Sequence, residues 1–67
     1  MNFNGEELML MMLYNSGTRL GLIHELRLMQ CYLMPDETAL RELSEGVIEK
    51  LKLMTDAQFA EVEFPMD

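Results

Sequence analysis

Two side chains with catalytic or metal-binding potential lie in the middle of the chain. His24 is followed by Glu25, as in the His-Glu-x-x-His zinc motif, but Leu28 stands where the second histidine is required. One imidazole with scattered carboxylates gives too few ligands for a tetrahedral zinc site. Cys31, the single cysteine, would lie about 10.5 Å further along a shared helix than His24, so the two cannot form a thiolate–imidazole pair within a monomer.

These observations predict no catalytic residue, no metal site and no cofactor. We expect His24 to be an ordinary surface or boundary histidine. We expect Cys31 to behave as a small buried or half-buried hydrophobe. The sequence therefore favours a protein that is not an enzyme.

Glutamates in the second half of the chain form another candidate site. Such an array can imitate a phosphate backbone and occupy the basic surface of a DNA-processing protein. The more ordinary interpretation is a solvated helix face, because basic residues are interspersed and negative charge chiefly aids solubility. The glutamates in question are Glu37, Glu42, Glu45 and Glu49.

The overall charge disfavours two classes of partner. Twelve acidic residues face five basic ones, so the formal net charge is −7. Residues 35–67 carry most of it, with nine acids against three bases. Phosphate binding depends on clustered Lys and Arg, and this chain has no such cluster. Direct nucleic-acid binding and adsorption to anionic lipid are both disfavoured.

An uninterrupted apolar run occupies Leu8–Tyr14. It is far shorter than the roughly 20 residues of a membrane span, and no positively charged region precedes it. With one cysteine and no leader signal, we expect a cytoplasmic protein. Because a helix that is apolar all round is normally buried, we expect the other helices to wrap around this segment or a partner to share it.

Capping signals place the first two helices. Asn4 and Glu7 form a capping box that opens a helix extending to Tyr14, and Gly17 can end it in a left-handed conformation. Thr18 caps the second helix, which we expect to continue until Pro35 ends it. Its apolar stripe consists of Leu22, Ile23, Leu26, Met29 and Leu33.

The second half predicts one long helix and one short helix. Asp36 and Glu37 are expected to open the long one, and Gly46 either accommodates a close helix crossing or bends it. Thr55 opens a helix over roughly 56–62. Residues 63–67 are expected to be loose. The apolar stripe of the long helix consists of Leu40, Leu43, Val47, Leu51 and Met54, with Ile48 beside it. The prediction is a single all-α domain over residues 1–67, a small helical bundle of three main helices plus a short C-terminal one.

A further hypothesis is that four short helices leave some of the apolar residues of this chain uncovered. The surplus side chains would form a patch for a protein partner or for a second copy of the chain. The candidate contact residues are Met9, Met12, Leu20, Leu28 and Tyr32.

Three stretches together resemble a known family. They are 14–19 with Leu22 and Ile23; 32–33 followed by 35–37, Leu40 and Leu43; and 50–51 with 54–56 and Phe59. The chain is similar in these stretches to the small transposon-transfer assisting proteins encoded in conjugative transposons of Gram-positive gut bacteria. The resemblance implies an all-helical domain with an accessory role in element transfer. It carries over no catalytic or binding residue.

The residues and the resemblance together favour an accessory protein that binds another protein, either a component of the transfer machinery or a second copy of the chain. The acidic regulator of a DNA-processing protein is the alternative. High salt should weaken the electrostatic mode steeply and the apolar mode little.

Overall fold

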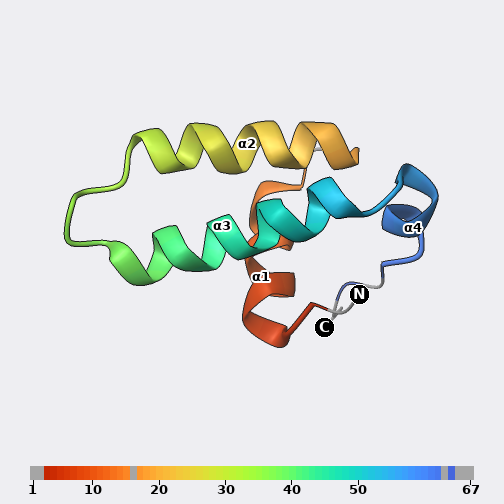
Figure 1. Ribbon diagram of the computed structural model, residues 1–67, viewed down its shortest axis with the longest axis horizontal. Helices are drawn as coiled ribbons and strands as arrows, with labels where there is room; N and C mark the ends of the chain where they lie inside the picture. The colour runs from red at the N-terminus through yellow and green to blue at the C-terminus, as the bar shows by residue number, and fades with distance from the viewer. Residues whose placement is uncertain (1–2, 16, 63, 65–67) are drawn as a thin grey trace.

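The computed structural model describes residues 3–15, 17–62 and 64, and within them the chain is all helical. The helices are α1 (Gly5–Tyr14), α2 (Arg19–Cys31), α3 (Thr38–Leu53) and α4 (Asp56–Ala60). This confirms the predicted bundle of three main helices and a short fourth. Figure 1 shows α2 and α3 as an antiparallel pair, with α1 crossing them and α4 at the far end of α3.

The helix starts follow the predicted caps. The side chain of Asn4 accepts a hydrogen bond from the backbone N–H of Glu7, whose carboxylate accepts one from the N–H of Asn4. Thr18 accepts from the N–H of Gly21 at the start of α2. Gly17 has a φ of +98°, the left-handed conformation that glycine adopts without strain.

The turn between α2 and α3 differs from its prediction at both ends. Helix α2 ends at Cys31, four residues before Pro35. The N–H groups of Tyr32 and Leu33 donate to the carbonyls of Met29 and Gln30, three residues earlier, and these bonds tighten the last turn. Glu37 begins α3 as its N-cap, but its side chain makes no capping bond, and neither Glu37 nor Asp36 lies in the first turn. The carboxylate of Glu37 instead accepts a hydrogen bond from the N–H of Met34 at 3.0 Å, which closes the turn.

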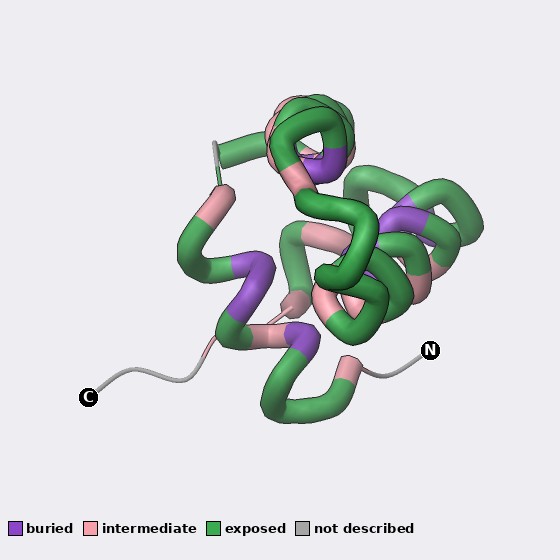
Figure 2. Tube along the Cα trace, turned by 90° about the vertical axis from the view of Figure 1, so that its left-hand side faces the viewer, coloured by how far each residue is buried: buried purple, intermediate pink, exposed green. Residues whose placement is uncertain are grey.

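The core lies where the three long helices meet. Figure 2 shows the buried positions of each helix turned toward the other helices. A buried polar contact joins α2 to α3, where the amide of Gln30 donates to the hydroxyl of Ser44 at 2.8 Å. The buried apolar residues are Leu10, Met11, Leu22, Leu26, Val47, Ile48, Leu51 and Met54.

Of the two alternatives for the Leu8–Tyr14 run, enclosure by the other helices is wrong, and sharing with a partner stays a prediction. Leu10 and Met11 are buried, but Met9 is 63% exposed and Leu13 is 78% exposed. Helix α1 packs against α2 and α3 from one side. Because nothing within the described residues covers its opposite side, an apolar surface faces solvent there.

Helix α3 continues without interruption through Gly46, where it meets α1. A Cβ placed on Gly46 would lie 3.6 Å from Oε2 of Glu7, an ordinary contact distance. Beyond α3, Phe59, Val62 and Phe64 are half-buried and pack against the core. Apart from Phe64, the segment expected to be loose lies outside the described residues.

No helix formed by the described residues is both long enough and apolar enough to cross a membrane.

Candidate functional site

An open groove lies where the C-terminal half of α2 faces the end of α1 and the start of α3. Its volume is about 420 Å³, and it is widely open to solvent. We call this surface the α2 groove. Its lining residues are Tyr14, Glu25, Leu28, Met29, Tyr32, Leu33, Glu37 and Leu40.

The apolar floor of the α2 groove belongs to the edge of the core. Tyr14, Met29 and Leu40 are half-buried and pack against the core residues, so their positions are fixed by the fold. Leu28 and Tyr32, one helical turn apart on α2, are exposed. The groove therefore combines a fixed floor with an exposed aromatic edge.

Two carboxylates provide the charge of the α2 groove. Glu25 is half-buried on α2, and Glu37 is exposed just before α3. The eight lining residues include no Lys, Arg or His. The groove is therefore apolar at its floor and negative at its edge.

The five predicted contact residues are all exposed, but the structure gathers only some of them. Leu28 and Tyr32 line the α2 groove. Leu20 lies on α2 two turns before Leu28, while Met9 and Met12 lie on the exposed side of α1. These three do not line the groove.

Sequence reasoning missed most of the groove, including Tyr14 and Glu25. Nothing in the sequence showed which residues of α1 and α3 would face α2.

The acidic candidates divide into two places. Glu42, Glu45 and Glu49 are exposed and lie within about 60° of one another around α3. Glu37 stands apart from them, before the helix begins. Lys50 turns away from this face to contact Glu7, so it does not dilute the three carboxylates as its place in the sequence suggested.

Glu7 is a buried carboxylate that ties α1 to α3. Its Oε1 lies 2.7 Å from Nζ of Lys50 and accepts the N–H of Asn4 at 2.9 Å. Burial alone would raise the pKa of Glu7, but the hydrogen bonds from Lys50 and Asn4 and the charge of Lys50 outweigh it and lower the pKa. Lys50 also lies 5.5 Å from the ring centroid of Phe3. The ion pair between Glu7 and Lys50 holds α1 in place across α3.

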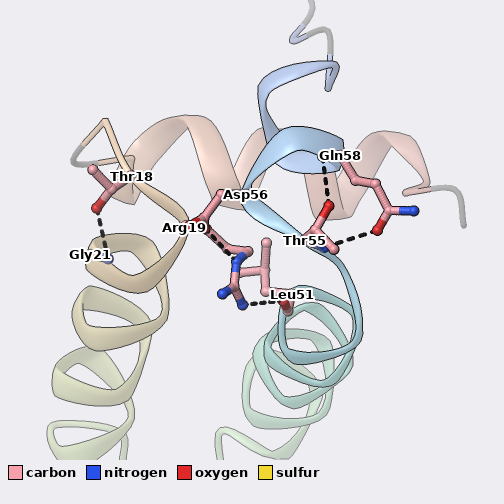
Figure 3. Close-up of polar contacts among 7 residues, drawn as sticks. All are labelled: Thr18, Arg19, Gly21, Leu51, Thr55, Asp56 and Gln58. Carbon is pink, nitrogen blue, oxygen red and sulfur yellow. Dashed lines mark hydrogen bonds and ion pairs between the residues drawn. The ribbon is translucent and has the colours of Figure 1, made fainter.

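Arg19 makes a second tie, shown in Figure 3. Its guanidinium donates to Asp56 through Nε and to the backbone carbonyl of Leu51, each at 2.8 Å. Beside it, Thr55, the predicted start of this helix, forms a capping box of α4 with Gln58. Arg19 thus joins the start of α2 to the α3–α4 corner and serves the fold.

The other chemistry-bearing residues lie at the surface. His24 and Cys31 are both exposed, so the prediction that Cys31 is buried or half-buried is wrong. Cys31 directly follows Gln30, the residue that contacts α3. Cys31 therefore lies about 100° further around the helix and does not face α3. Within the part of the chain that the structure describes, no three His, Cys, Asp or Glu side chains come together as ligands.

The fold and the α2 groove define a small all-α domain with an open apolar surface. Residues 3–65 match the family described as "Putative transposon-transfer assisting protein". The match covers nearly the whole chain, and the chain belongs to this family, as the resemblance in its sequence indicated. Searches of curated proteins and of solved structures give no match.

Proposed function

We propose that this chain is a non-enzymatic accessory protein that assists conjugative-transposon transfer by binding another protein in the cytoplasm. The observation that supports binding is the number of large apolar side chains left in solvent. Eight are exposed among the described residues of a chain only 67 residues long. The family description supports the role in transfer.

The proposed contact residues are drawn from these exposed side chains. They are Met9, Met12, Leu20, Leu28 and Tyr32. Leu28 and Tyr32 lie together in the α2 groove, and an exposed apolar patch on a small domain typically marks a site of protein association. Methionine and tyrosine suit such a site, because the thioether adapts its shape and the phenol ring covers a large area with few rotatable bonds.

The position of three glutamates favours a second candidate function. Glu42, Glu45 and Glu49 share one exposed side of α3. In this alternative, that side occupies the basic surface of a DNA-processing protein and regulates it. The mixed charge at its edge, where Arg41 and Lys52 are also exposed, makes this the weaker candidate.

The test uses two variants of the full chain in donor cells that carry the intact element. One replaces Met9, Leu20 and Tyr32 with serine, and the other replaces Glu42, Glu45 and Glu49 with glutamine. Cross-linked partners and transfer frequency are measured for each, after the circular dichroism of both variants has been compared with that of wild type.

Loss of partner and transfer in the apolar variant alone supports the proposed function. Loss in the acidic variant alone, with the wild-type complex dissociating at high salt, supports the alternative. If both variants keep the same partners and transfer normally, neither surface acts in transfer.

A further inference from the structure

We propose that the α2 groove binds a peptide segment of the partner protein whose apolar side chains are flanked by Lys or Arg. This inference rests on the proposed function, because it specifies which part of a protein partner is recognised. It selects one of the exposed apolar surfaces as the recognition site and assigns that site a ligand chemistry.

The floor of the groove is suited to apolar side chains. Met29 and Leu40 pack against the core on their inner sides and line the groove on their outer sides. The floor therefore exists before a ligand arrives, which reduces the ordering cost of binding. Tyr32 stands at the edge with 84% of its surface exposed, and it can cover a bound side chain by rotating about its side-chain bonds.

The charge of the groove selects the flanking residues of the ligand. Glu25 and Glu37 contribute two carboxylates, and the lining includes no cation. Lys or Arg beside the apolar anchors would pair with these carboxylates at the edge, where such pairs add specificity and speed association. An acidic segment or a phosphate backbone would be repelled.

The same charges argue against a second copy of the chain as the occupant. Each copy carries a formal net charge of −7, so self-association through this groove would bring two acidic proteins together at an acidic edge. A cationic segment of another protein meets no such opposition.

Site-specific photo-cross-linking tests the location. Benzoylphenylalanine replaces one residue at a time in donor cells carrying the element, at Tyr32 in the groove, at Met9 on α1, or at Leu53. Leu53 is an exposed apolar residue that does not line the groove. The cross-linked peptide is then identified by mass spectrometry. All three positions are exposed, and circular dichroism confirms that each variant remains folded.

We expect the Tyr32 position to capture one partner segment that contains Lys or Arg next to apolar residues, with no such product from Leu53. Capture from Met9 but not from Tyr32 would overturn the groove proposal and leave the proposed function standing. Capture of a second copy, of nucleic acid or of a segment without Lys or Arg at Tyr32 would also overturn it. Absence of protein products at all three positions would overturn both.

A pair of charge-matched variants tests the chemistry. The captured segment is synthesised as a peptide, and its Kd is measured by fluorescence anisotropy for E25Q/E37Q and for E42Q/E45Q. Both variants remove two negative charges, but only the first removes them from the groove. We expect roughly three- to tenfold weaker binding for E25Q/E37Q, as for two exposed ion pairs, and less than twofold for E42Q/E45Q. An equal loss of affinity in both variants would show that only the net charge of the protein matters. That result would overturn the proposed role of the groove.

Discussion

The inner and outer sides of α1 and α2 carry the same residue types in opposite surroundings. Leu26 is fully buried, whereas Leu28 on the same helix is 44% exposed. Met11 is fully buried, whereas the adjacent Met12 is exposed to the same extent as Leu28. Hydrophobicity is therefore not what separates core from surface here. The difference arises from which side of each helix has a neighbour, and it leaves apolar residues available for a partner.

The largest expected effect comes from truncating the inner side. Leu26→Ala should lower the free energy of unfolding by about 2–5 kcal/mol, since it removes buried methyl groups and leaves a cavity. This is a large part of the roughly 3–10 kcal/mol expected for a domain of this size. Leu28→Ala, measured beside it by urea denaturation, should change stability by less than about 0.5 kcal/mol. Similar losses in both variants would mean that Leu28 is covered in solution.

The Glu7–Lys50 contact gives the next largest effect. Glu7→Gln should destabilise the fold by about 1–3 kcal/mol, because a neutral acceptor replaces a charged one and the ion pair with Lys50 is lost. The neighbouring Glu6 is exposed, so Glu6→Gln serves as the matched control and should have almost no effect. Thermal unfolding of the two variants should separate them clearly, and equal melting temperatures would contradict a structural role for Glu7.

The lowered pKa of Glu7 predicts how stability depends on pH. A carboxyl whose pKa is lower in the folded state stabilises the fold above its unfolded value, here 4.5, and loses that contribution as the pH falls through its folded pKa. The free energy of unfolding should therefore decline below about pH 4.5. The decline should be smaller in Glu7→Gln. Parallel pH profiles for wild type and variant would show that other carboxyls account for it.

A smaller effect of opposite sign is expected where α3 faces α1. Gly46→Ala should stabilise the fold by about 0.5–1 kcal/mol, since alanine favours the helix and the unfolded chain loses freedom. The added methyl group would meet Oε2 of Glu7 at an ordinary distance of 3.6 Å. Chemical denaturation measures the change. A marked loss of stability would show that the crossing is tighter than this distance indicates.

The smallest effect is expected on the outer side of α1. Leu13→Ser should change stability by no more than about 0.5 kcal/mol, because its side chain is 78% exposed. It should also reduce the binding of a hydrophobic dye. A destabilisation comparable with that of Leu26→Ala would mean that this side is covered, for example by a second copy.

The sequence predicted the local features of the fold well. The caps at Asn4, Thr18 and Thr55 and the left-handed Gly17 depend on residues within one turn, so short sequence patterns contain the necessary information. The end of α2 was placed too late, because the turn geometry before Pro35 depends on hydrogen bonds that no pattern specified.

Long-range features could not be predicted in the same way. The sequence around Glu7 does not indicate whether its side chain is solvated or buried. Its partner Lys50 is 43 residues away, beyond the reach of any local pattern. The buried contact between Gln30 and Ser44 was missed for the same reason. In the α2 groove, the spacing along α2 was enough to suggest Leu28 and Tyr32. Tyr14 and Glu37 join them only because three helices meet there.

The separation of its contacting residues implies an order of assembly for this domain. Gln30 and Ser44 join α2 to α3 across 14 residues, whereas Glu7 and Lys50 join α1 to α3 across 43. Closing the shorter loop costs less entropy, so the α2–α3 hairpin can form first and offer a template on which α1 docks. The Glu7–Lys50 ion pair would then form after the α2–α3 contact during folding and be lost before it when the native state opens.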